Sequence, residues 1–291
     1  MRAGAVDIGT NSMRLLVTDG VEEVARRVEV TGLGRGVDRT GTLSPERIEE
    51  SLAALARFGV EMDREDVELR KAIATSASRD AANREEFFDL AESALGVRPR
   101  LITGEEEARY SYAGATARLE VERPIVVSDI GGGSTEFVTA EGGLSIDIGS
   151  VRLTERAIPS RPAPAAELAT ARAMIADLFE AIDLRARTVI GVAGTWTSIA
   201  AIAQDLPKHN RERVHGYRLE RDRLDHVVDS LAGKTVVETA AIPALDPKRA
   251  LVILAGSLVA SGVMDLLHAG EVTVSEHDSL DGVAMELLAL P

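Results

Sequence analysis

The most constraining feature of the sequence is an internal repeat. Residues 5–12, AVDIGTNS, return at residues 127–134 as VSDIGGGS, so that Asp, Ile, Gly and Ser occupy the same places in both copies. In each copy apolar residues precede Asp-Ile-Gly and a second apolar run follows it, which is typical of a strand, a tight glycine turn and another strand. Because the two copies begin at residues 5 and 127, they predict a fold that is made of two similar halves.

Alternating strands and helices are expected after each copy. The first copy precedes a predicted strand at 24–30, helix at 45–58, strand at 71–75 and helices at 83–95 and from Thr103; the second precedes a helix at 164–182, a strand at 188–193 and a helix from near Thr195. We therefore predict an α/β protein with domains 1–120 and 121–291 and an active-site cleft between them. In this division the C-terminal helix can pack back on the first domain.

Composition narrows the class of protein. The 291 residues contain no cysteine, which excludes disulfides and a thiol nucleophile and agrees with a cytoplasmic protein. The formal net charge of −14 opposes binding to duplex nucleic acid or to an anionic membrane. The apolar stretch 250–264 is shorter than the roughly 20 residues that span a bilayer, so we predict a buried helix there. A small polyanion is still compatible, because a cleft can gather local cations and a metal ion.

The two glycine turns are candidate phosphate-binding loops. Glycine can adopt positive φ, which lets consecutive N–H groups converge on an anion, and neighbouring hydroxyl groups add donors. One loop alone would be read as an ordinary hairpin turn, but the repeat favours phosphate binding. The candidate residues are Gly9, Thr10, Asn11 and Ser12 in the first copy and Gly131, Gly132, Gly133 and Ser134 in the second.

Each loop follows an aspartate, Asp7 or Asp129, at the end of a predicted strand. Carboxylates in this place can hold Mg²⁺ directly or through water. We therefore predict a divalent-metal site, with Mg²⁺ as the ion and Mn²⁺ as the alternative.

Glu107 is the candidate general base. Thr103 and Glu106 have the spacing of a capping box at a helix start, which gives Glu106 a structural role and leaves Glu107 without one. One and two turns further on, the face of Glu107 carries Ser111 and Gly114, small residues that we expect to leave space for substrate.

Two further charged residues are candidates for the site. Arg79 follows a predicted strand and could bind phosphate oxygens through its guanidinium, although a surface arginine is an equal alternative. Glu136 follows the second loop closely enough to reach the same phosphate, although an exposed strand residue is a near-equal alternative. The cationic segment 208–218 could line a polyanion path, but a solvated loop explains such a run more commonly. Trp196 is predicted to be a core residue.

Taken together, these motifs resemble the exopolyphosphatase and guanosine pentaphosphate phosphohydrolase family, within the superfamily of actin, sugar kinases and heat-shock chaperones. The matching segments are 7–12, 75–79, 104–109, 129–136, 191–195, 214–219 and 275–277. The resemblance implies two actin-like (ribonuclease H-like) domains, Mg²⁺ dependence, a homodimer, and hydrolysis of the terminal phosphoanhydride of polyphosphate or of the pentaphosphate alarmone.

The resemblance also implies roles for single residues. It assigns the catalytic base to Glu107, places Arg79, Asp129 and Glu136 around the scissile phosphate, and brings the motif of Gly194 and Thr195 into the phosphate-binding set. The chain departs from the family pattern in two places. Long relatives continue into extra helical domains, whereas this sequence stops at Pro291; and many relatives have Gly-Leu-Arg where this sequence has Asp278-Ser279-Leu280 before Asp281.

The predicted function is that of an exopolyphosphatase. Three alternatives stay open from the sequence: a guanosine pentaphosphate phosphohydrolase, a kinase of the same superfamily, and a non-catalytic nucleotide or alarmone sensor.

Overall fold

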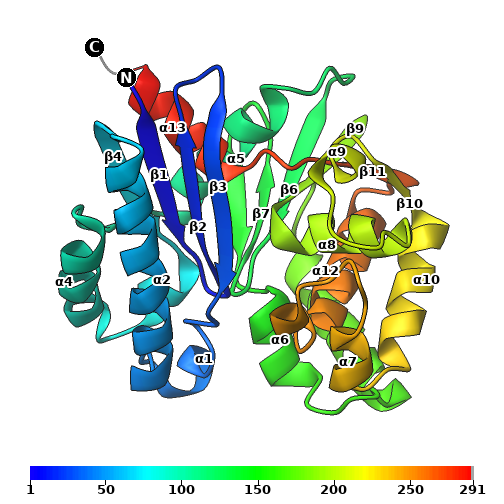
Figure 1. Ribbon diagram of the computed structural model, residues 1–291. Coiled ribbons are helices and arrows are strands. Elements are labelled where there is room, and N and C mark those ends of the chain that lie inside the picture. Colours follow the sequence, from blue (N-terminus) through cyan, green and yellow to red (C-terminus); the bar gives the residue numbers. More distant parts are fainter. Residues whose placement is uncertain (290–291) are drawn as a thin grey trace. The chain divides into compact units, whose positions relative to one another are not determined.

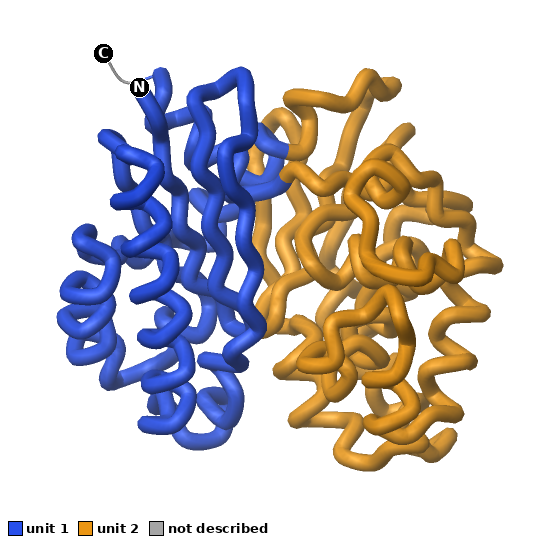
Figure 2. The backbone as a smooth tube through the Cα atoms, in the orientation of Figure 1, with its two compact units in different colours: residues 1–114, 278–291 blue, residues 115–277 orange. Residues whose placement is uncertain are grey.

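The structure is a computed structural model in which residues 1–289 are described. The chain divides into two compact units (Figure 2). Unit 1 contains residues 1–114 and the segment that begins at Asp278, and unit 2 contains residues 115–277. The helix near the C-terminus therefore belongs to unit 1, and the boundary that the sequence suggested at 120/121 lies a few residues inside unit 2.

Unit 1 contains a five-stranded sheet in the order β3-β2-β1-β4-β5 (Figure 1). The strands are β1 (Ala3–Ile8), β2 (Ser12–Thr18), β3 (Glu23–Val30), β4 (Leu69–Ala74) and β5 (Arg100–Leu101). The central strand β1 pairs antiparallel with β2 and parallel with β4, and all six of its residues are buried. Asp7 thus lies near the end of the most enclosed strand of the unit.

Helices cover both faces of this sheet. They are α1 (Val37–Thr40), α2 (Pro45–Arg64), α3 (Ser76–Asp80), α4 (Arg84–Leu95), α5 (Gly104–Thr116) and α13 (Ser279–Leu288). Side chains alternate along a strand, so Val6 and Ile8 join one apolar cluster with Phe58 of α2, while Ala3 and Ala5 join another with α13.

Helices α5 and α13 approach each other at the level of the backbone. A Cβ on Gly114 would lie 1.9 Å from the carbonyl oxygen of Asp278, and one on Gly282 would lie 2.2 Å from that of Tyr110. The expectation that Ser111 and Gly114 leave space for substrate is therefore wrong. Ser111 is fully buried, and the space beside Gly114 is filled by the chain that leads into α13.

Unit 2 repeats the same topology in its six-stranded sheet, β10-β11-β9-β6-β7-β8. The strands are β6 (Ile125–Ile130), β7 (Thr135–Val138), β8 (Gly143–Ile146), β9 (Thr188–Val192), β10 (Arg218–Glu220) and β11 (Glu271–Val274). Strand β6 takes the place of β1, since it pairs antiparallel with β7 and parallel with β9. The predicted duplicated α/β fold is confirmed by this repeated strand order, whereas a cleft between the domains stays a prediction.

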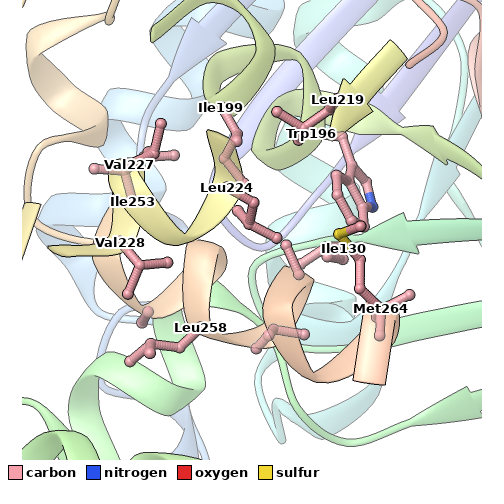
Figure 3. Packing of buried hydrophobic residues seen from close by; sticks show 14 of the residues in the cluster. Ile130, Trp196, Ile199, Leu219, Leu224, Val227, Val228, Ile253, Leu258 and Met264 are labelled. Carbon is pink, nitrogen blue, oxygen red and sulfur yellow. The ribbon is translucent and has the colours of Figure 1, made fainter. Parts of the chain in front are cut away.

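The helices of unit 2 enclose its largest apolar cluster. They are α6 (Ser150–Ala157), α7 (Ala165–Phe179), α8 (Ala193–Ala203), α9 (Arg211–Val214), α10 (Arg221–Ala232), α11 (Val236–Ala240), the 3₁₀ turn η1 (Pro247–Arg249) and α12 (Ile253–Leu266). Figure 3 shows Trp196 among aliphatic side chains of this cluster, including Leu219 and Met264. Trp196 is fully buried, as predicted, and its Nε1–H donates to the hydroxyl of Ser128 at 3.3 Å.

Helix α12 contains most of the apolar stretch 250–264, and 11 of its residues are buried, as the sequence predicted. Within residues 1–289, none of the helices combines the length and apolar character needed to cross a membrane.

The close crossing of α5 and α13 gives a stability prediction. We expect Gly114→Ala to lower the free energy of unfolding by roughly 1–3 kcal/mol, because the added methyl group would overlap a backbone oxygen that can move only with its helix. Gly233→Ala is the matched control, since its φ is −78° and the nearest atom to a Cβ there is 3.8 Å away. Urea denaturation measures both. Equal stability of the two variants would contradict the close crossing.

Candidate active site

Both units form the same glycine turn after their central strand. In unit 1 the N–H of Gly9 donates to the carbonyl oxygen of Ser12 at 3.1 Å, and in unit 2 the N–H of Gly131 donates to that of Ser134 at 3.0 Å. The predicted strand, turn and strand are confirmed in both copies. The expected positive φ is wrong for Gly9 and Gly131, which lie outside the left-handed region. Glycine instead lets the two backbone segments of the turn approach each other closely, since a Cβ at Gly9 would lie 3.0 Å from the Ser12 carbonyl oxygen.

The loop of unit 1 is fixed by the segments beside it. The hydroxyl of Thr10 accepts a hydrogen bond from the N–H of Ala77 at 3.2 Å, which joins the loop to α3. The carbonyl oxygen of Thr10 accepts from the N–H of Gly34 at 2.8 Å, and that of Asn11 accepts from Thr31 at 3.1 Å. The loop is therefore held in place by hydrogen bonds from the segments that follow β3 and β4.

Three buried oxygen atoms of unit 1 have no hydrogen-bond partner among the described residues: Asp7 Oδ1, Asn11 Oδ1 and Ser78 Oγ. Asp7 is 3 % exposed, Asn11 6 % and Ser78 1 %. Buried polar atoms in folded proteins are normally hydrogen-bonded, so these atoms indicate a place for a ligand. Carboxylate and amide oxygens suit a hydrated divalent cation, so the residues fit the predicted metal.

The other oxygen of Asp7 is held by residues that the sequence analysis did not assign to the site. Asp7 Oδ2 forms an ion pair with Arg14 on β2, and the hydroxyl of Ser279 donates to it at 3.4 Å. Arg14 also forms an ion pair with Asp278. Arg14 is opposite Asp7 in the local hairpin, whereas Asp278 and Ser279 come from the other end of the chain, so no short-range pattern indicated their contact with Asp7.

Arg79 and Glu107 are brought together in unit 1. Arg79, on α3, donates from Nη1 to Glu107 Oε2 at 3.1 Å and to the carbonyl oxygen of Ile102 at 3.0 Å. The predicted capping box at the start of α5 is confirmed, since Thr103 and Glu106 exchange hydrogen bonds of 3.0 and 3.1 Å. Glu106 is thus engaged by its cap, while Glu107 is oriented by an arginine.

In unit 2 the second aspartate faces a glutamate. Asp129 on β6 and Glu136 on β7 are directly opposite in the antiparallel ladder, 5 % and 0 % exposed. Glu136 accepts a hydrogen bond from the hydroxyl of Ser145 at 2.6 Å. The alternative of an exposed strand glutamate is therefore wrong. Residues opposite each other in a ladder have Cβ atoms about 4.5–5.5 Å apart, so two buried carboxylates lie close together, an arrangement that a cation would stabilise.

The motif of Gly194 and Thr195 lies beside this pair of strands. The hydroxyl of Thr195 donates to the carbonyl oxygen of Ile130 at 2.9 Å, next to the loop of unit 2. A Cβ on Gly194 would lie 2.1 Å from Nη1 of Arg249, so the guanidinium of Arg249 packs on this glycine. Arg249 is a further residue that the sequence analysis did not identify.

The cationic segment 208–218 is partly neutralised within unit 2. His209 Nε2 lies 2.8 Å from Glu276 Oε1, and Arg211 Nε donates to Glu276 Oε2 at 3.3 Å. Burial alone would raise the pKa of Glu276, but these two partners outweigh it and lower the pKa below its ordinary value. Arg218 forms an ion pair with Glu271. The contacts favour a structural explanation of this segment over a polyanion path.

Among residues 1–289, no three histidine or acidic side chains gather into a metal cluster. Mg²⁺ in proteins is commonly held by one or two carboxylates together with water and substrate phosphates. Single aspartates and a carboxylate pair beside glycine loops are therefore compatible with a metal ion that is held by one or two protein carboxylates.

Twin glycine loops, each after a buried aspartate, are the feature that the sequence analysis predicted to bind phosphate. Residues 16–290 match the model of the Ppx/GppA phosphatase family, and the chain belongs to this family. Exopolyphosphatase 2 of Mycobacterium tuberculosis is 38 % identical to it, over 98 % of each chain.

Two crystal structures are similar over almost the whole chain. An exopolyphosphatase-like protein has a TM-score of 0.93 and 34 % identity, covering 98 % of both chains. An exopolyphosphatase from Cytophaga hutchinsonii has a TM-score of 0.91 and 26 % identity, covering 99 % of this chain and 98 % of that one. The family resemblance read from the sequence is confirmed.

Two glycines of one motif should respond differently to alanine. A Cβ on Gly191 would lie 2.6 Å from the buried ring of Trp196, whereas one on Gly194 would meet only the guanidinium of Arg249, the far end of a long side chain. We expect Gly191→Ala to lower the free energy of unfolding by roughly 1–3 kcal/mol. Gly194→Ala should stay within about 0.5 kcal/mol of wild type while it weakens substrate binding. Thermal unfolding measures the stability of each variant, and substrate titration measures its affinity. A larger loss of stability in Gly194→Ala than in Gly191→Ala would refute the different roles given to these two glycines.

Proposed function

We propose that the protein is a divalent-metal-dependent exopolyphosphatase that hydrolyses the terminal phosphoanhydride of inorganic polyphosphate and releases orthophosphate. The observation that carries the proposal is the pairing of Arg79 with Glu107 in the unit that contains the first phosphate loop. The near-full-length similarity to a protein named exopolyphosphatase 2 supports the same substrate.

The proposed reaction is the attack of water on the terminal phosphorus. Glu107 takes a proton from the water as the new P–O bond forms, the bridging P–O bond breaks, and the shortened chain leaves with the bonding electrons. Arg79 orients the Glu107 carboxylate through their hydrogen bond and adds positive charge beside the transferring group. Because phosphoryl transfer has a loose transition state, positioning and charge stabilisation provide most of the catalysis.

The loops and acidic residues have separate roles in this proposal. The phosphates are bound by the two glycine loops and the motif beside the second loop: Gly9, Thr10, Asn11 and Ser12; Gly131, Gly132, Gly133 and Ser134; and Gly194 and Thr195. Asp7 and Asp129 hold Mg²⁺, with Mn²⁺ as the alternative, and Glu136 supports Asp129 from the opposite strand. When bound, the ion neutralises charge on the phosphate oxygens.

Three properties extend the proposal. We infer a cytoplasmic location from the lack of cysteine. We infer a polyphosphorylated small molecule as the partner, and not duplex nucleic acid or a membrane, because the net charge of −14 opposes those two larger polyanions. A homodimer follows from the family resemblance. Size-exclusion chromatography with light scattering tests the oligomeric state directly.

The test of the proposed base is Glu107→Gln. A general base commonly contributes about 10²- to 10⁴-fold in rate, so we expect orthophosphate release from polyphosphate to fall by that factor while polyphosphate binding stays near wild type. Glu105→Gln is the matched control, because Glu105 lies in the same first turn of α5 but is exposed. It should retain wild-type turnover.

Substrate comparison separates the proposal from the alternatives. Release from polyphosphate that exceeds release from guanosine pentaphosphate supports the exopolyphosphatase. Faster release from the pentaphosphate would replace it with the alarmone hydrolase, transfer of labelled phosphate to a sugar or acid would indicate a kinase, and tight binding without turnover would indicate a sensor. Full activity of Glu107→Gln would remove the base assignment.

A further inference from the structure

In unit 1 the strand partner of the loop aspartate is a cation. Asp7 and Arg14 are opposite each other in the ladder of β1 and β2, as Asp129 and Glu136 are in β6 and β7. The register is the same in both copies, so Arg14 occupies the place that Glu136 occupies in unit 2. An aspartate paired only with an arginine has little net charge left to attract a divalent ion.

A second carboxylate compensates for that arginine. Arg14 bridges Asp7 and Asp278 with its two terminal nitrogens, and Nη2 also donates to the hydroxyl of Ser279 at 3.0 Å. The side chains of Arg14, Asp7 and Asp278 are 15 %, 4 % and 10 % exposed. The cluster contains two carboxyl groups for one guanidinium, so Asp278 opposes the positive charge of Arg14 and the cluster favours a cation more than the Asp7–Arg14 pair alone would.

The geometry also fixes the direction of the Asp7 carboxylate. Arg14 and Ser279 both bind Oδ2, whereas Oδ1 is buried and has no hydrogen-bond partner within residues 1–289. A carboxylate held at one oxygen cannot rotate freely, so the other oxygen keeps one orientation. Groups that orient a metal ligand in this way commonly change metal affinity by 10- to 100-fold when they are altered.

Asp278 is itself firmly placed. It is the N-cap of α13, where Oδ1 accepts from the N–H of Leu280 at 3.0 Å and its own N–H donates to Asp281 Oδ2 at 3.0 Å. Asp281 in turn forms an ion pair with Arg26 on β3 at 2.8 Å. Burial raises the pKa of Asp278, and the positive charge of Arg14 opposes that shift.

We propose that Asp278 is a positioning residue of the metal site in unit 1: through Arg14 it orients the Asp7 carboxylate and restores the negative charge that Arg14 removes, so that Asp7 Oδ1 is presented to a divalent cation. This rests on the role of Asp7 in the proposed function.

Asp278→Asn separates positioning from helix capping. Asparagine is as good an N-cap as aspartate, so the start of α13 is kept while the charge opposite Arg14 is lost. Asp281→Asn is the matched control, because it removes one carboxylate from the same capping box but from a residue that pairs with Arg26. Mn²⁺ binding is measured by electron paramagnetic resonance without substrate at pH 8, which favours ionised Asp278, and thermal unfolding is recorded for each variant.

We expect Asp278→Asn to weaken Mn²⁺ binding about 10-fold or more, Asp7→Asn to weaken it at least as much, and Asp281→Asn to leave it within about twofold. In turnover with polyphosphate, Asp278→Asn should raise the Mg²⁺ concentration for half-maximal rate by a similar factor and leave the rate at saturating Mg²⁺ near wild type.

Unchanged Mn²⁺ binding in Asp278→Asn or in Asp7→Asn would overturn the inference, as would an equal loss in Asp281→Asn. A wild-type protein that binds Mn²⁺ in this Asp278-dependent way but releases no orthophosphate from polyphosphate would contradict the proposed function and leave the positioning role in place.

Discussion

The candidate site depends on one constraint that occurs twice: a buried central strand ends in a tight turn, in which a Cβ at the glycine would crowd a backbone oxygen. The N–H of Gly9 bonds back to the carbonyl oxygen of Ser12, which opens the next strand, and the N–H of Gly131 bonds back to that of Ser134, which directly precedes the next strand. This closes the turn and fixes the register of the two strands. The register in turn places residue 14 opposite Asp7 and residue 136 opposite Asp129, so the turn decides which side chain each aspartate meets.

The two copies have diverged at that position. In unit 2 Asp129 meets the buried Glu136, and both carboxylates lie on one face of the ladder. In unit 1 Asp7 meets Arg14, and the chain brings Asp278 from the start of α13 to the same guanidinium. A duplicated fold thus supports two different charge arrangements beside equivalent glycine turns, and α13 contributes to the first of them as well as covering the sheet of unit 1.

Much of this architecture could be predicted from the sequence because it is local and periodic. The repeat predicted both strand–turn–strand segments, and the spacing of Thr103 and Glu106 predicted the cap that singles out Glu107. The role of the glycines was misjudged, because sequence cannot distinguish a glycine that needs positive φ from one that needs close approach. The ion pair of Arg14 with Asp278 joins residues 264 positions apart, and no periodic pattern in the sequence indicates a contact over such a separation. Gly114 was misjudged for the same reason, since its neighbour is the distant Asp278.

The central claim is that Glu107, oriented by Arg79, activates the water that attacks polyphosphate. A crystal structure of the protein with Mg²⁺ and a non-hydrolysable polyphosphate analogue measures this most directly, through the position of the water in line with the terminal phosphorus. The account predicts that this water lies within about 2.6–3.2 Å of a Glu107 carboxylate oxygen. An in-line water held by another carboxylate, with Glu107 beyond hydrogen-bonding reach, would contradict it.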